Sequence, residues 1–251
     1  MEVAQQVRAM LDADLQETVP KMCLLGPING LVGVAENALP GQPLEIAATN
    51  NRRNTALASN CRAFAQWLIR FQTCTQGCVT QIDRGVLESL LMHVLERSPG
   101  ANDTHEWVTD EIADKLLGQQ MPLVWAYGDA HPSNILIKDG LVSGVVDWEG
   151  AEPGQWAVFD WFQFTLSLAQ ELLKAKDPSM DRLQRAVTAC ELLIRHPNTR
   201  EAMILQEQTA SFLSMLNLCP GLTRALFLVF LIAYYWFEDK EALVHSLLDQ
   251  L

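Results

Sequence analysis

The chain has 251 residues, of which 49% are apolar, and its 30 acidic and 18 basic residues give a formal net charge of -12. An apolar fraction of this size supports a substantial core and argues against disorder over most of the chain. The negative charge opposes binding to nucleic acids and to anionic membranes, so we expect a small, neutral or cationic partner.

The amino-terminal pattern predicts a helix followed by a β-hairpin. Val3, Val7, Met10 and Leu11 are spaced as one apolar stripe of an amphipathic helix that begins almost at the first residue. After Pro20, two short apolar runs flank the sequence GPING, which predicts two strands joined by a tight turn. The prolines and glycine of LPGQPL then predict a connecting segment.

The rest of the chain predicts helices, a small group of strands, and then helices again. Apolar residues recur at helical spacing from about residue 56 to residue 71, and two further helical patterns read DRGVLESLLMHVLER and EWVTDEIADKLLG. The segments PLVWAYGD, NILIKD and LVSGVVDW predict short strands, with Asp139 and Gly140 as a hairpin turn. This order predicts an α+β fold with a dominant helical part. The last helices are expected at roughly 156–175, 179–195, 199–217 and 221–249.

Cysteine spacing and hydropathy predict a cytoplasmic protein. The closest cysteine pair, Cys74 and Cys78, fits neither a CxxC redox motif nor a usual zinc site, so free thiols in a reducing compartment are expected. No secretory signal opens the sequence. The most apolar run, residues 225–237, is clearly shorter than the roughly 20 residues that a bilayer span needs, so this run predicts a buried core helix.

Residues 127–151, YGDAHPSNILIKDGLVSGVVDWEGA, bring three oxygen-bearing side chains into a short span. Asn134 precedes one apolar strand and Asp147 follows another. If these strands pair, both side chains lie at the open end of one hairpin and offer the oxygen ligands that Mg²⁺ prefers. Asp129 is placed to accept a hydroxyl proton during attack on phosphorus. The alternative is that all three are turn residues that hydrogen-bond their own backbone.

This segment resembles the catalytic and metal-binding loops of the aminoglycoside phosphotransferase family, which is choline kinase-like and related to protein kinases. In members of the family, this stretch has a sequence similar to HGDxHPxNIL, followed by a short hairpin and then by an apolar run that ends in IDWE. Upstream, LVGVAEN and LPGQPL look like the inter-lobe hinge and its turn, and FAQWLIRFQ looks like the helix beneath the catalytic loop. The segment GAEPGQWAVFD, which ends at Asp160, also looks like its counterpart. The resemblance covers most of residues 1–165.

The resemblance implies a protein-kinase-like fold and an ATP-dependent transfer of the γ-phosphoryl group to a hydroxyl of a small molecule. Carried over residue by residue, it makes Asp129 the catalytic base and Asn134 and Asp147 the ligands of Mg²⁺. The backbone near Ala35 and Asn37 would meet the adenine of ATP. No nucleic-acid or membrane partner is implied, and the oligomeric state is left open.

Two departures from the family pattern bear on this prediction. Tyr127 stands where the family usually has histidine, at a position that packs and hydrogen-bonds behind the loop. Family members also carry, ahead of the first helix, strands with a phosphate-covering loop and a lysine, whereas the first lysine here is Lys21. The expected organisation is therefore a truncated amino-terminal lobe, residues 1–40, and a large helical carboxy-terminal lobe, residues 41–251. The alternative is a catalytically inactive pseudokinase that binds a nucleotide or a partner.

Overall fold

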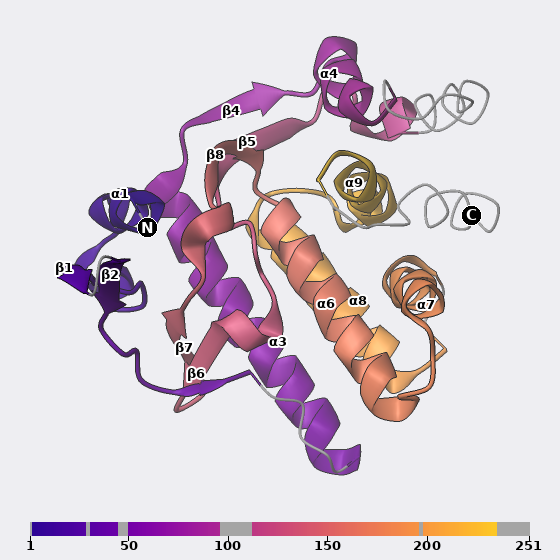
Figure 1. The fold of residues 1–251 in the computed structure, drawn as a ribbon. Helices are drawn as coiled ribbons and strands as arrows, with labels where there is room; N and C mark the ends of the chain where they lie inside the picture. The colour runs from indigo at the N-terminus through magenta and orange to yellow at the C-terminus, as the bar shows by residue number, and fades with distance from the viewer. Residues whose placement is uncertain (1, 29–30, 45–49, 96–111, 196–197, 235–251) are drawn as a thin grey trace. The chain divides into compact units, whose positions relative to one another are not determined.

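The structure is a computed structural model that describes the chain except for residues 1, 29–30, 45–49, 96–111, 196–197 and 235–251 (Figure 1). The chain divides into two compact units. The first consists of Met1–Gly77 and Leu123–Asp160, and the second of Cys78–Pro122 and Trp161–Leu251. The expected boundary near residue 40 between two lobes stays a prediction.

The first unit begins with the expected helix and hairpin. Helix α1 spans Glu2–Met10 and a short helix α2 spans Ala13–Gln16. Asp12 caps α2, because its Oδ1 accepts a hydrogen bond of 2.9 Å from the Leu15 N–H. Strands β1 (Met22–Ile28) and β2 (Leu31–Glu36) then pair antiparallel as a two-stranded sheet.

Helix α3 spans Asn50–Thr75 and supplies the aromatic core of the first unit. It contains the helix expected at 56–71 and is longer at both ends. Phe64, Trp67 and Phe71 are buried, and the rings of Trp67 and Phe71 stack with centroids 5.2 Å apart. The ring centroid of Phe71 also lies 5.6 Å from that of Trp148. Helix α3 therefore packs directly against the segment that carries Asp147.

Short strands carry the sequence motif. The turn at Asp139 and Gly140 has positive φ at both residues, 53° and 79°. A type I′ hairpin turn requires this conformation. The predicted hairpin is therefore confirmed, and its register pairs Ile135 with Val145. One sheet has the order β3-β6-β7 and another the order β4-β5-β8. Their strands are β3 (Gln42–Pro43), β4 (Cys78–Gln81), β5 (Gln120–Ala126), β6 (Ile135–Lys138), β7 (Leu141–Val145) and β8 (Glu152–Trp156).

Helices dominate the second unit, as expected from the periodicity. Helix α7 (Arg182–Ile194) packs against α8 (Arg200–Met215), and both contact α9 (Thr223–Val229). The buried rings of Trp161 and Phe212 stack with centroids 4.7 Å apart. The expected helix at 106–118 is helical from 112 to 116, and its residues 106–111 lie outside the described part. The other helices in this part of the chain are α4 (Arg84–Leu95) and α6 (Phe159–Lys176).

The last apolar run is buried as far as the structure describes it. Leu226 to Ile232 are all buried, and α9 continues into a π-helical turn, Phe230–Tyr234. Residues beyond Tyr234, including the end of the helix expected at 221–249, lie outside the described residues. No described helix is long and apolar enough by itself to cross a membrane, and only the bent pair Arg200–Met215 and Pro220–Ile232 passes that test jointly.

The described cysteines are free thiols, as expected. Cys61 and Cys190 are fully buried, and loss of solvation raises the pKa of Cys61 to about 12. These two side chains therefore act as small apolar core residues.

Candidate functional site

A buried carboxylate anchors the loop that carries Asp129. Asp160, in the first turn of α6, accepts hydrogen bonds from the backbone N–H groups of Tyr127 (2.8 Å) and Gly128 (2.9 Å). The Asp160 residue is 1% exposed. Burial raises its pKa to about 6, and the two N–H donors oppose that rise. The two residues that lead into Asp129 are thus held by one side chain from a distant part of the sequence.

Gly128 brings this loop into direct contact with the loop that follows Asp147. Its φ of 86° lies in the left-handed region. This region favours glycine. A Cβ atom at this position would overlap the carbonyl oxygen of Gly150. Only a residue without a side chain permits this approach of the two backbones. The absence of a Cβ at Gly128 therefore brings Asp129 close to the segment of Asp147.

Asn134 is bonded directly to Asp129. A 3-10 helix, Pro132–Asn134, follows His131 and turns the chain back, so that the Asn134 Nδ2 lies 2.6 Å from the Asp129 Oδ2. Since a carboxylate can only accept, the amide nitrogen faces Asp129 and the amide oxygen is turned away from it. The Ser133 hydroxyl is 3.3 Å from that amide oxygen. Asn134 therefore supports Asp129 with one end of its side chain and presents an oxygen ligand with the other.

The backbone places Asp147 beside Asn134. The Val146 N–H donates to the Asn134 carbonyl oxygen at 3.0 Å, beyond the last pair of the β6-β7 hairpin. Asp147 itself has φ 65° and ψ 62°. This left-handed conformation is uncommon for residues other than glycine. Its side chain is exposed and makes no capping hydrogen bond to the short helix Trp148–Gly150 that follows. Its carboxylate is therefore open to a ligand.

Tyr127 packs behind this arrangement, as expected from its place in the motif. It is fully buried, its hydroxyl donates to the Val146 carbonyl oxygen, and its ring meets that of Trp148 edge-on at 4.8 Å. Burial, with the nearby carboxylates of Asp129 and Asp147, raises the pKa of the hydroxyl, so it stays protonated. Tyr127 therefore ties the loop of Asp129 to that of Asp147 without a charge of its own.

The charges at the site favour a cation. Partial burial raises the pKa of Asp129, the negative charge of Asp147 raises it further, and the hydrogen bond from Asn134 opposes both. A cation that lies between two carboxylates offsets the repulsion between their negative charges. No group of three or more His, Cys, Asp or Glu side chains in the described residues can hold a metal ion. A magnesium site, however, needs only one or two carboxylates when phosphates supply the other ligands.

The β1-β2 hairpin places the two residues expected to contact adenine at the end of β2. The Asn37 N–H donates to the Lys21 carbonyl oxygen at 3.1 Å, and its side-chain oxygen accepts from the Lys21 N–H. Along an antiparallel strand, the peptide groups of successive residues point alternately toward the partner strand and away from it. The peptide groups of Ala35, opposite Cys23, therefore also face β1, and those of Glu36 face away from it. The adenine contacts of Ala35 and Asn37 stay a prediction, and Glu36 is the residue whose peptide groups face outward.

Comparisons with known proteins identify a family and structures of similar fold. Residues 4–183 match the model of a family described as the phosphotransferase enzyme family. No curated protein sequence matches the chain. A solved glucosamine kinase in complex with glucosamine, ADP and inorganic phosphate is 18% identical, with a TM-score of 0.52 over 99% of this chain and 68% of its own. Another crystal form of glucosamine kinase has a TM-score of 0.53, covers 99% of this chain and 69% of its own, and is also 18% identical.

A more distant structure is a thermostable mutant of an aminoglycoside phosphotransferase bound to AMP-PNP and hygromycin B. It is 12% identical with a TM-score of 0.42, covering 97% of this chain and 82% of its own. At these identities the glucosamine kinase structures show the fold alone. They confirm the expected α+β fold of the kinase-like phosphotransferase type.

We expect Gly128→Ala to disrupt the site and Gly140→Ala to be mild. Both glycines have positive φ, 86° and 79°. Both substitutions therefore cost about 1 kcal/mol from the left-handed conformation. Only at Gly128 does the new Cβ meet the Gly150 backbone, since nothing lies within 4 Å of the Cβ position at Gly140. Urea unfolding of the wild type and of both variants measures the loss of unfolding free energy. Equal losses of unfolding free energy would contradict the close contact of the two loops.

We expect Asp160 to make the unfolding free energy fall as the pH rises from about 4 to about 6. Its pKa is raised from 3.8 to about 6 in the folded chain, so in this window the folded state holds a proton that the unfolded state has released. The loss is on the order of 3 kcal/mol and is complete above about pH 6. Unfolding of the wild type and of Asp160→Asn, which cannot titrate, at each pH measures this difference. Parallel pH profiles would rule out the raised pKa.

Proposed function

The chain belongs to the phosphotransferase enzyme family, and on this premise we propose that it transfers the γ-phosphoryl group of ATP to a hydroxyl group of a small molecule with the help of Mg²⁺. The observation that supports this proposal is the meeting of Asp129, Asn134 and Asp147 at the open end of one hairpin. These are a carboxylate to accept a proton and two oxygen donors for a hard cation.

Asp129 is proposed as the catalytic base. Its carboxylate would accept the proton of the acceptor hydroxyl as that oxygen attacks the γ-phosphorus in line, with no phosphoenzyme. The 2.6 Å hydrogen bond from Asn134 orients the Oδ2 atom and leaves the Oδ1 atom for the acceptor. Burial and the neighbouring Asp147 raise the pKa of Asp129, which makes it a stronger proton acceptor than a solvated aspartate.

Asn134 and Asp147 are proposed to hold Mg²⁺. The donor set fits this ion, because the Asn134 amide oxygen is turned away from Asp129 and the Asp147 carboxylate is exposed without a capping partner. When bound, the ion would offset the charge of the transferring phosphates. The adenine would meet the backbone near Ala35 and Asn37, with the peptide groups of Glu36 facing away from β1.

The acceptor is proposed to be a small molecule rich in hydroxyl groups. The fold neighbours include a glucosamine kinase in complex with glucosamine and ADP, so amino sugars are a reasonable first set to test. A net charge of -12 suits a cationic acceptor better than an anionic one. Transfer of phosphate to a panel of amino sugars, neutral sugars and amino alcohols would identify the class.

We expect ATP with Mg²⁺ to stabilise the wild type but not Asp147→Ala. At a nucleotide concentration of about 100 times Kd, binding adds about 2.7 kcal/mol to the free energy of unfolding. Thermal unfolding with and without ATP and Mg²⁺ measures the effect, and each variant serves as its own reference. Glu149→Gln removes an exposed carboxylate close to Asp147 in the chain and should keep the full stabilisation. If the wild type gains nothing, both the kinase and the pseudokinase proposals fail.

We expect Asp129→Asn to lower kcat by roughly 10²- to 10⁴-fold, because the new amide oxygen still accepts the hydrogen bond from Asn134 but cannot take up a proton. Stabilisation by ATP and Mg²⁺ should remain. Asp139→Asn changes an exposed aspartate in the same hairpin and should leave kcat unchanged. Nucleotide binding by the wild type without transfer to any hydroxyl would instead favour the pseudokinase alternative.

A further inference from the structure

The turn between α2 and β1 is held by side chains from both α1 and α3. Arg8, in α1, donates from its Nη1 to the carbonyl oxygens of Gln16 and Val19, the latter at 2.6 Å. Trp67, in α3, donates from its indole N–H to the Thr18 hydroxyl at 3.0 Å. That hydroxyl donates its own proton to the Leu15 carbonyl oxygen at 2.7 Å. The turn, Gln16–Val19, is therefore constrained from two helices.

This turn reaches the proposed metal loop through one backbone hydrogen bond. The Val145 N–H, at the end of β7, donates to the Thr18 carbonyl oxygen at 2.8 Å. The Val145 carbonyl oxygen accepts from the Trp148 indole N–H, also at 2.8 Å. Both peptide groups of Val145 are thus bonded outside its hairpin ladder. Since Asp147 follows shortly after, the position of Thr18 sets where the chain enters the left-handed conformation of Asp147.

Arg8 is suited to this role by charge and geometry. Its side chain is 17% exposed. Its guanidinium reaches the carbonyl oxygen of Gln16, the last residue of α2, and that of Val19 in the turn that follows. A third contact goes to the exposed Glu17 carboxylate at 3.2 Å. The planar fork of arginine can bond several acceptors at once in a defined orientation, whereas lysine is a mobile point charge. Loss of Arg8 would remove the side-chain donor from the Gln16 and Val19 carbonyls, and this would loosen the Thr18 peptide that lies between them.

We propose that Arg8 is a positioning residue for Asp147: it holds the Gln16–Val19 turn, and this turn sets the metal loop through the bond from Val145 to Thr18. The inference rests on the proposed function, in which Asp147 is a ligand of Mg²⁺. Helix α1 would thus affect the reaction through Arg8, which is not among the residues proposed to meet the nucleotide, the metal or the acceptor. Its loss should therefore act on metal use rather than on acceptor binding.

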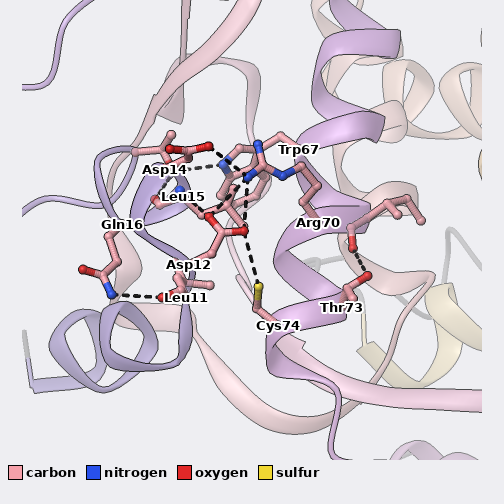
Figure 2. Close-up of polar contacts among 11 residues, drawn as sticks. Leu11, Asp12, Asp14, Leu15, Gln16, Trp67, Arg70, Thr73 and Cys74 are labelled. Carbon is pink, nitrogen blue, oxygen red and sulfur yellow. Dashed lines mark hydrogen bonds and ion pairs between the residues drawn. The ribbon is translucent and has the colours of Figure 1, made fainter.

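A neighbouring ion pair offers a matched control. Arg70, in α3, bonds the Asp12 carboxylate at 3.1 Å and lies 3.8 Å from that of Asp14 (Figure 2). Arg70 and Asp12 are about half exposed, so this pair contributes little to stability. It links α3 to the start of α2, whereas Arg8 bonds the carbonyls of the Gln16–Val19 turn. Arg70→Ala therefore removes an arginine close to the same short helix without releasing Thr18.

We expect Arg8→Ala to speed amide hydrogen exchange at Val145 by about tenfold or more, because the carbonyls on either side of the Thr18 acceptor lose the guanidinium that holds them. Exchange at the Phe64 amide, in the core of α3, should change far less, which separates local opening from global loss of stability. Arg70→Ala should leave Val145 unchanged. In Arg8→Lys, the Val145 amide should also exchange faster than in the wild type. This variant serves as the test if Arg8→Ala does not fold. Unchanged exchange at Val145 in both Arg8 variants, or an equal effect of Arg70→Ala, overturns the proposal.

In the phosphotransfer assay, Arg8→Ala should raise the Mg²⁺ concentration that gives half-maximal rate by about fivefold to tenfold and leave the KM for the acceptor unchanged. A change in acceptor KM with an unchanged Mg²⁺ dependence would contradict the role assigned to Arg8. The two readouts also separate the hypotheses. Wild-type protein without any ATP and Mg²⁺ stabilisation would refute the proposed function, whereas the exchange at Val145 tests the link from Arg8 to the Asp147 loop on its own.

Discussion

The arrangement of the site depends on a single buried carboxylate. Asp160 takes the two N–H groups of Tyr127 and Gly128 that would otherwise be unpaired at the end of β5. An unsatisfied buried N–H costs roughly 1 to 3 kcal/mol, so the loop has a strong reason to keep this conformation. The cost is a carboxylate whose burial raises its own pKa to about 6. With this anchor in place, Asp129 begins its loop from a defined position.

The remaining contacts fix the loop of Asp147 relative to the loop of Asp129. The backbone of Gly128 lies against that of Gly150, Asn134 is bonded to Asp129, and the Tyr127 hydroxyl reaches the carbonyl before Asp147. The ring of Trp148 packs against those of Tyr127 and of Phe71 in α3. The polar groups of the proposed site are thus partly exposed at their tips, while aromatic packing and buried hydrogen bonds hold the backbone behind them. A site that must bind a charged ligand without rearranging needs such support.

Local patterns in the sequence predicted those parts of the fold that short-range physics decides. Asp139 and Gly140 predicted the type I′ turn because few residues accept positive φ, and the hairpin then placed Asn134 near Asp147. Strand β8 was not expected, because EPGQW has no alternating pattern and contains proline and glycine. It is a strand only because β5 lies beside it, with Leu123 opposite Trp156. Helix α6 accordingly begins at Phe159, later than the periodicity indicated.

The sequence by itself determined which residues carry the proposed chemistry, since the motif around Asp129, Asn134 and Asp147 indicated the phosphotransferase family. It did not determine what holds them. The role of Asp160 on the Tyr127 and Gly128 amides, the direction of the peptide groups at Asn37, and the path from Arg8 through Thr18 to Val145 were decided by the tertiary structure. The physical reason is that these are hydrogen bonds between backbone groups and side chains far apart in the chain. Every residue has the same backbone groups, so no pattern of residue types reveals which ones meet.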